Sequence, residues 1–432
     1  MARDIFAKSL PKQLLLKNAR LIDILQKRDE IADILITDGR IEKIGKLTVS
    51  GAETIDLTGK IVTHGFMDMH VHLREPGRED KETVWTGCNA AMAGGFTAIA
   101  CMPNTTPPID LPDTVLFVKS RAEKHLVDVY PVGCVSKNRE GKELAEIGNL
   151  VEAGAVSITD DGDPVYNAEL MSRSLEYVKM YDIPVIEHAE DKQLTNRGSM
   201  HEGFTSTRLG LRGIPSISEE TIVARDILLA EYTDSRVHIA HISTGGTVRL
   251  VREGKKRGIK VTCEVCPHHF TLTDLAVENY DTFAKMNPPL REQKDIDEIK
   301  IGLQDGTIDI IATDHAPHTT EDKECEFDHA AFGITGLETC VGITLSDLVH
   351  KKIITLESAI DKLAIAPRKL LNLPLPELTP GAAATMTILD LDKVWKYDVT
   401  QTCSKSVNTP YNGYEMRGKA VGVIHKEKIF ME

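Results

Sequence analysis

Short apolar runs recur through the middle of the chain, separated by longer stretches with helical spacing. Eight of these runs are typical of buried strands, and each is followed by enough residues for a helix. They span residues 61–70, 96–102, 126–133, 155–160, 183–188, 236–241, 259–265 and 308–314. Strands that alternate with helices favour a parallel sheet. The pattern therefore predicts an α/β fold of the (β/α)8 TIM-barrel type, with its active site at the carboxyl ends of the strands.

Both ends of the chain have a different pattern. Residues 13–60 and 384–432 are typical of short strands, and the N-terminal turns carry Asp-Gly and Thr-Gly pairs. We expect residues 1–60 and 375–432 to form one small, discontinuous β-sandwich domain. Residues 61–374 would then form the barrel.

Composition and charge exclude several classes of function. The formal net charge of −14 disfavours nucleic-acid binding, which requires a basic face. No apolar run approaches the roughly 18 residues of a membrane helix, and the N-terminus lacks the apolar core of a secretory signal. Eight cysteines spread over 432 residues do not indicate a disulfide framework. We expect a cytoplasmic protein that acts on a small molecule, with no membrane or nucleic-acid partner.

Candidate metal ligands lie where the predicted strands end. His70 and His72 share one face of a strand because strand side chains alternate, and two such imidazoles can bind one metal ion. A single His-x-His pair is more often a packing feature. Ligand types recur, however, at the ends of four other predicted strands, which gives the set His70, His72, Asp161, His188, His241 and Asp314.

Four histidines and two carboxylates suit one or two zinc ions. If one carboxylate bridges two ions, they lie about 3.5–4 Å apart and can generate a hydroxide nucleophile near neutral pH. Asp314 is the candidate general acid and base, since it lies beside the predicted metals and precedes a polar loop. That loop, residues 317–333, is expected to cover the site and to be able to close.

Ordered motifs along residues 13–430 resemble the dihydroorotase family of the amidohydrolase superfamily. They are HVHLREPG (70–77), MPNTTPP (102–108), DDGDPV (160–165), EHAED (187–191), HIST (241–244), CPHHF (266–270), NPPLR (287–291), ATDHAPH (312–318) and FGITGLE (332–338). The resemblance implies that His70, His72 and Asp314 hold one zinc ion, that His188 and His241 hold a second, and that Asp161 contacts both.

The resemblance also implies a type of dihydroorotase and a set of substrate contacts. Some relatives bridge the metals with a carboxylated lysine, but no lysine lies between Val151 and Asp163. This indicates the longer-chain bacterial type, in which an aspartate takes the place of the bridging lysine. Arg74 would bind a substrate carboxylate through a bidentate guanidinium. The implied substrate contacts are His72, Arg74, Asn104, Asn287, His318, Phe332 and Gly333.

The implied reaction is the reversible cyclisation of N-carbamoyl-L-aspartate to L-dihydroorotate plus water, a step of de novo pyrimidine (UMP) biosynthesis. Metal-bound hydroxide would be the nucleophile in the hydrolytic direction. The resemblance further suggests a homodimer and an association with aspartate transcarbamoylase. Two alternatives stay open: an allantoinase or dihydropyrimidinase-like enzyme, and a non-catalytic paralogue that scaffolds aspartate transcarbamoylase.

Three other features receive a structural interpretation. We expect Cys263 and Cys266 to be buried free thiols rather than ligands of a structural zinc ion, because no second C-x-x-C pair completes the set. Gly94 and Gly95 are expected to end a helix before a strand. Asp68 is expected either to orient a ligand histidine or to satisfy backbone donors.

Overall fold

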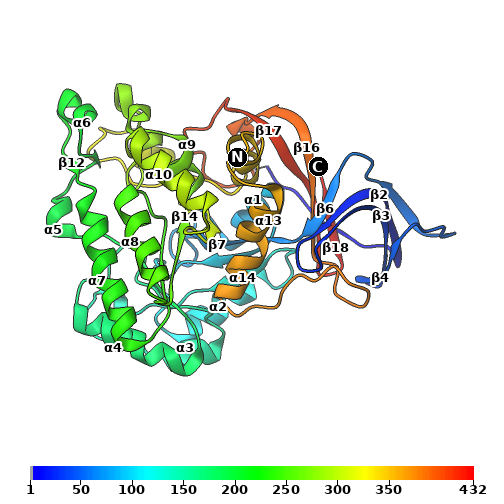
Figure 1. The fold of residues 1–432 in the computed structure, drawn as a ribbon, viewed down its shortest axis with the longest axis horizontal. Helices are drawn as coiled ribbons and strands as arrows, with labels where there is room; N and C mark the ends of the chain where they lie inside the picture. The colour runs from blue at the N-terminus through cyan, green and yellow to red at the C-terminus, as the bar shows by residue number, and fades with distance from the viewer. Residues whose placement is uncertain (1–2) are drawn as a thin grey trace.

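The computed structural model describes residues 3–432, and its central part is built on parallel strands (Figure 1). Two parallel sheets lie there. One contains β7 (Phe66–Val71), β8 (Phe96–Cys101) and β9 (Asp128–Pro131); the other contains β10 (Val185–Glu187), β13 (Val237–Ile239), β14 (Val261–Val265) and β15 (Ile310–Ile311).

Single parallel bridges join the two sheets at both edges. Ile158 pairs with Gly133 after β9 and with Val185 of β10. At the other edge, Val71 of β7 pairs with His315, just after β15. Parallel strand pairing therefore connects all eight predicted segments in turn and returns to β7. The predicted α/β class is confirmed. The predicted strand 155–160 is reduced to this one bridge at Ile158.

Helices follow the parallel strands and pack around them, with α4, α7 and α8 on the side away from the termini (Figure 1). The α-helices are α1 (Val84–Gly94), α2 (Pro112–Ala122), α3 (Ile147–Ala153), α4 (Ala168–Val178), α5 (Lys192–Thr195), α6 (Phe204–Leu209), α7 (Ile217–Thr233), α8 (Gly245–Lys256), α9 (Pro267–Thr271), α10 (Gln293–Gln304), α11 (Thr320–Lys323), α12 (Cys340–Ile343), α13 (Leu356–Ile360) and α14 (Ala366–Leu370). Short 3-10 turns span Lys137–Arg139, Lys179–Tyr181, Asp274–Tyr280, Thr282–Ala284 and Val399–Gln401, and π-helical turns span Thr344–Val349 and Asp361–Ile365. Over residues 3–432, none of these helices is both long and apolar enough to cross a membrane.

The first helix shows how local sequence sets an element's bounds. The Thr83 side chain accepts a hydrogen bond from the Thr86 backbone N–H and caps the start of α1. Gly95 ends the helix with φ of 94°, a left-handed conformation that favours glycine. A Cβ at this position would also lie 2.3 Å from Ala420 Cβ. The predicted helix end before β8 is therefore confirmed.

The two ends of the chain meet in one nine-stranded sheet. Its strands are β1 (Lys8–Ser9), β2 (Gln13–Asp23), β3 (Arg28–Thr37), β4 (Arg40–Gly45), β5 (Glu53–Asp56), β6 (Ile61–His64), β16 (Met386–Lys396), β17 (Glu415–His425) and β18 (Lys428–Met431). A separate short pair joins β11 (Met200–His201) to β12 (Gly213–Ile214). The predicted sandwich thus takes the form of one hydrogen-bonded sheet with its own apolar core, which includes Leu16, Ile34, Val62, Met386 and Ile424.

The structure differs from the sequence prediction in two segments. The run 61–70 was predicted as one barrel strand, but Ile61–His64 pairs with β16 and belongs to the sheet of the termini. The chain passes from β6 to β7 at Gly65, where a Cβ would lie 2.5 Å from Thr97 Oγ1. Residues 397–414, predicted within the β-domain, form a long connection between β16 and β17 that contacts the loops of the parallel strands. The domain limits themselves stay predictions.

Candidate metal centre and active site

Asp161 lies at the centre of the predicted metal ligands. Its Oδ1 is 3.3 Å from His70 Nε2, 3.4 Å from His241 Nε2 and 3.7 Å from His188 Nδ1. Its Oδ2 is 3.5 Å from His72 Nε2, which in turn lies 2.8 Å from Asp314 Oδ1. The structure therefore brings all six predicted ligands together, although they come from five different strand ends.

Three of the four histidines are oriented by a contact of the ring nitrogen that faces away from Asp161. Such outer contacts fix the tautomer of a ligand histidine. In three of the four the outer nitrogen has an acceptor: His70 Nδ1 lies 2.6 Å from Glu264 Oε1, His72 Nδ1 lies 2.7 Å from Asn104 Oδ1, and His188 Nε2 lies 3.3 Å from Glu190 Oε2.

Two inner atoms of this cluster are orphaned. Within residues 3–432, His70 Nε2 and Asp161 Oδ1 are buried and have no hydrogen-bond partner. Buried polar atoms are nearly always paired, and a cation between these two would satisfy both. His70, Asp161 and His241 form one triplet with ligand atoms within 4.8 Å of one another; His70, His72 and Asp314 form another. The donor set of imidazole nitrogens and carboxylate oxygens thus fits one or two metal ions.

The carboxylates of the cluster are held ionised. Burial alone would raise the pKa of Asp161, but the charge of His70 and the nearby imidazoles of His188 and His241 hold it well below its usual range. Burial likewise opposes ionisation of Asp314, while the hydrogen bond and charge of His72 lower its pKa. Both groups are therefore charged acceptors at neutral pH.

Three residues of the site adopt an uncommon backbone conformation. Arg74, His241 and Asp314 have φ values of 60°, 30° and 48°. Non-glycine residues in the left-handed region carry local strain, which concentrates at functional sites. In each case the conformation lies at or just beyond a strand end, where it directs the side chain into the site.

A cavity of 240 Å³ opens on the metal cluster. It is lined by His72, Arg74, Asn104, Asp161, Gly162, His188, His241, Asn287, Asp314, Ala316, His318, Phe332 and Gly333. All the predicted substrate contacts are in this set. Burial lowers the pKa of Arg74 to about 10, so its guanidinium stays charged. The cavity therefore combines a metal-ligand cluster, a cation and amide groups.

The loop after β15 forms one wall of the cavity, as predicted. His318 Nε2 donates to the Phe332 carbonyl at 2.8 Å, and its Nδ1 lies 3.1 Å from Lys81 Nζ. Because ammonium can only donate, Nδ1 must be the acceptor and His318 neutral. Burial and the charge of Arg74 also lower the pKa of His318, to about 2.

Several functional contacts escaped the sequence analysis. Glu264 lies within the apolar strand β14, and a lone carboxylate in an apolar run is the signal that could have identified it. Lys81 and Glu190 carried no comparable signal. Asp68 satisfies the backbone N–H groups of His70 and Thr313 and contacts no ligand ring, which decides between its two predicted roles.

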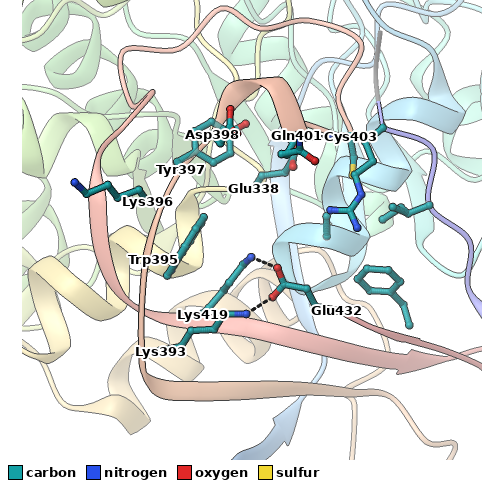
Figure 2. Close-up of a pocket in the computed structure, with 14 residues that line it drawn as sticks. Glu338, Lys393, Trp395, Lys396, Tyr397, Asp398, Gln401, Cys403, Lys419 and Glu432 are labelled. Carbon is teal, nitrogen blue, oxygen red and sulfur yellow. Dashed lines mark hydrogen bonds and ion pairs between the residues drawn. The ribbon is translucent and has the colours of Figure 1, made fainter.

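Another hollow, of 280 Å³, lies between the N-terminal segment and strands β16 and β17 (Figure 2). There Glu432 pairs with Lys393 at 2.7 Å and also with Lys419, whose ammonium lies 4.4 Å from the Trp395 ring centroid. Glu432 thus already has two cationic partners, and none of the three metal-ligand groupings of residues 3–432 lies there. The smaller cavity, of 240 Å³, is therefore the one that contains candidate metal ligands.

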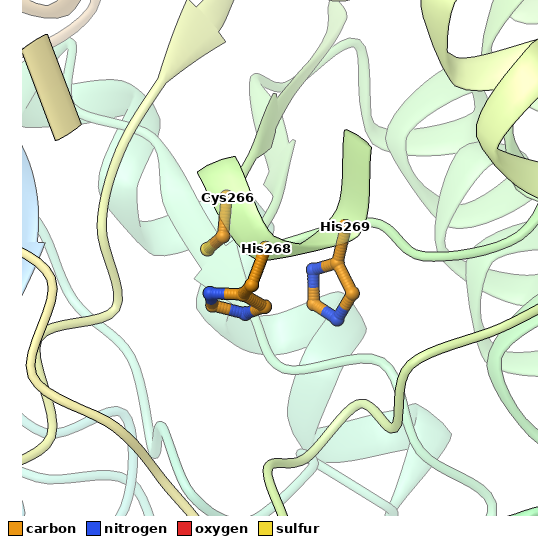
Figure 3. A group of neighbouring side chains, drawn as sticks. All are labelled: Cys266, His268 and His269. Atoms are coloured by element: carbon orange, nitrogen blue, oxygen red, sulfur yellow. The ribbon is translucent and has the colours of Figure 1, made fainter. Parts of the chain in front are cut away.

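Cys266, His268 and His269 form the third such grouping (Figure 3). The three residues come from a single segment at the start of α9, and His269 Nε2 already lies 3.0 Å from the Pro288 carbonyl oxygen. The Cys263 thiol is directed elsewhere, toward the Thr307 carbonyl. Both cysteines are buried and free, as predicted.

Comparisons with known proteins identify the family of this chain. Residues 59–246 match the family model described as Dihydro-orotase-like. The chain is 50% identical over 421 residues to a dihydroorotase of Pelotomaculum thermopropionicum, covering 97% of this chain and 99% of the relative. It is 51% identical over 414 residues to a dihydroorotase of Pelobacter propionicus, covering 95% and 97%.

The fold is also similar to solved structures. An L-hydantoinase (dihydropyrimidinase) from Arthrobacter aurescens matches with a TM-score of 0.86 at 27% identity, covering 97% of this chain and 96% of that one. A D-hydantoinase (dihydropyrimidinase) from Thermus sp. matches with a TM-score of 0.81 at 25% identity, covering 97% and 95%. The near-complete matches at about half identity show that this chain belongs to the dihydroorotase family.

Proposed function

We propose that the protein is a zinc-dependent dihydroorotase, which interconverts N-carbamoyl-L-aspartate and L-dihydroorotate in pyrimidine biosynthesis. One observation carries this proposal: the ligand cluster around Asp161 shares a small cavity with Arg74. A metal centre alone indicates hydrolysis in general. The added guanidinium selects a ring that bears a carboxylate.

The ligands divide into two groups that share Asp161. We assign His70, His72 and Asp314 to one zinc ion, and His188 and His241 to a second, with Asp161 contacting both. Bound zinc would polarise the ring amide carbonyl and lower the pKa of water. The chain's own residues supply the remaining steps.

Asp314 acts as the general acid and base. In the hydrolytic direction its ionised carboxylate takes a proton from the attacking water and returns it to the leaving ring nitrogen. In the ring-closing direction the same carboxylate removes a proton from the carbamoyl nitrogen. Its position 2.8 Å from His72 Nε2 keeps it beside the reacting atoms.

Substrate would occupy the cavity beside the ligand cluster. Arg74 binds the ring carboxylate, and Asn104, Asn287 and His318 hold the polar groups of the ring. The backbone at Phe332 and Gly333 covers the substrate and excludes water. His72 would hold metal and also contact substrate.

Some broader features belong to the same proposal. The circuit of parallel pairing through β7–β15 is interpreted as a closed (β/α)8 barrel, whose strand ends carry the site. A cytoplasmic location, a homodimer and an association with aspartate transcarbamoylase stay predictions. The scaffold alternative is disfavoured because all six ligand side chains and Arg74 are present and converge.

Turnover of three substrates tests the proposal against its enzymatic alternative. Purified protein is expected to hydrolyse L-dihydroorotate far faster than dihydrouracil or allantoin, which lack a carboxylate for Arg74. Brisk turnover of dihydrouracil or allantoin without turnover of L-dihydroorotate would replace the proposal with the dihydropyrimidinase or allantoinase alternative.

Replacing Arg74 with alanine is expected to weaken substrate binding without emptying the metal site. A charge-assisted hydrogen bond contributes about 1.5–3 kcal/mol, so KM should rise roughly 10- to 100-fold. Steady-state kinetics and zinc content check this together. An unchanged KM would remove Arg74 from the substrate contacts, and loss of zinc would show that Arg74 instead supports the metal centre.

A further inference from the structure

The connection between β16 and β17 leaves the sheet of the termini and reaches the active-site loops. Glu82 holds it through the Ser404 hydroxyl and, at 3.0 Å, the Lys405 backbone N–H. Glu338 accepts from the backbone N–H of Cys403 at 2.9 Å and of Ser404 at 3.2 Å. The buried carboxylate of Glu82 and the half-buried carboxylate of Glu338 thus fix the path of residues 403–405, and Asn408 follows three residues later.

The Asn408 side chain is buried and bonds only to the backbone of the cavity wall. Its Oδ1 accepts from the His318 N–H at 3.0 Å. Its Nδ2 donates to the Ala316 carbonyl at 2.9 Å and to the Gly333 carbonyl at 3.1 Å. All three partners line the active-site cavity. One amide therefore joins both ends of the loop that follows β15.

We propose that Asn408 is a positioning residue for catalysis, which sets the distance between His318 and Gly333 across the substrate. This inference rests on the proposed function, in which these two residues contact substrate. It also gives the C-terminal part of the chain a role in the active site, although this part lies outside the parallel strands.

The chemistry of the position requires an amide. A primary amide offers an acceptor and two donor hydrogens in one plane, which matches one backbone N–H and two carbonyls. A carboxylate of the same shape keeps the bond from His318 N–H but places negative oxygen against two carbonyl oxygens. The substitution Asn408→Asp therefore changes the loop geometry with little change in volume.

Asn412 offers a matched control on the same connection. It is exposed, and its Oδ1 accepts from the Val399 backbone N–H at 3.2 Å, a bond that an aspartate can also accept. Asn412→Asp makes the same chemical change without contact with the cavity wall. Any general effect of added charge on this connection appears in both variants.

The test compares wild type, Asn408→Asp and Asn412→Asp by steady-state kinetics on L-dihydroorotate, zinc content and thermal unfolding. Misplacement of a positioning group by about 1 Å costs on the order of 100-fold in rate. We expect kcat/KM of Asn408→Asp to fall roughly 100-fold, largely through KM, with zinc content unchanged. Asn412→Asp should stay close to wild type.

Each outcome is decisive. Wild-type protein without dihydroorotate turnover contradicts the proposed function itself. Active wild type with Asn408→Asp kinetics equal to those of Asn412→Asp contradicts the positioning role, even if the melting temperature falls. If Asn408→Asp does not fold, Asn408→Ala, which removes the three bonds without adding charge, decides by the same criterion.

Discussion

Asp314→Asn is expected to lower turnover of L-dihydroorotate by on the order of 1,000-fold or more, because general acid–base catalysis contributes about 10²–10⁴-fold. Asparagine has the same shape as aspartate but cannot accept and return the proton. The carboxylate is also held ionised by His72, so wild type has its base in the active form at neutral pH.

The kinetics of Asp314→Asn need a fold and metal control. Thermal unfolding should show an intact structure, and zinc content should show that His70, His72 and Asp161 still hold metal. Near-normal kcat with L-dihydroorotate would refute the assignment of Asp314 as general acid and base. Loss of activity together with loss of all zinc would assign Asp314 a ligand role only.

Asp161→Asn is expected to abolish metal binding at the cluster. Asp161 Oδ1 faces three imidazole nitrogens and Oδ2 faces a fourth. The amide removes the charge that both proposed zinc ions share. Loss of an outer contact of a metal ligand typically costs 10–100-fold in affinity, so loss of the central ligand should cost more than ~100-fold. The zinc content of the protein after dialysis measures this loss of affinity. Turnover of L-dihydroorotate is expected to fall in parallel.

Asp163→Asn provides the matched control. Asp163 lies two residues further along, is 40% exposed, and pairs with Arg139 at 2.8 Å outside the cavity. The same change of carboxylate to amide there should leave zinc content and turnover near wild type. Full zinc occupancy in Asp161→Asn would contradict the shared-ligand arrangement.

The convergence of the six candidate ligands around Asp161 could be predicted from the sequence because their signal is local. A ligand-type side chain ends an apolar run, and strand ends in a parallel sheet meet at one edge. Asp161 shows that this holds even where the strand itself nearly vanishes, since its segment pairs only at Ile158. The position of the ligand could therefore be predicted from the end of the apolar run, even though that run is paired with its neighbours only by the bridges at Ile158.

Contacts between distant segments were not predictable in this way. Glu264 lies 194 residues from His70, and Lys81 lies 237 residues from His318. Nothing in the local pattern around Lys81 or Asn408 distinguishes them from surface residues. The division at Gly65 was hidden for a related reason: the apolar run continues across it while the pairing partner changes from β16 to β8.

Zinc dependence of the proposed reaction is the central claim, and one measurement tests it most directly. Protein stripped of metal by a chelator is reloaded with zinc in steps, and bound zinc and L-dihydroorotate turnover are measured on the same samples. We expect turnover to disappear with the metal and to return in proportion to zinc bound at the Asp161 cluster. Undiminished turnover in zinc-free protein would contradict the account.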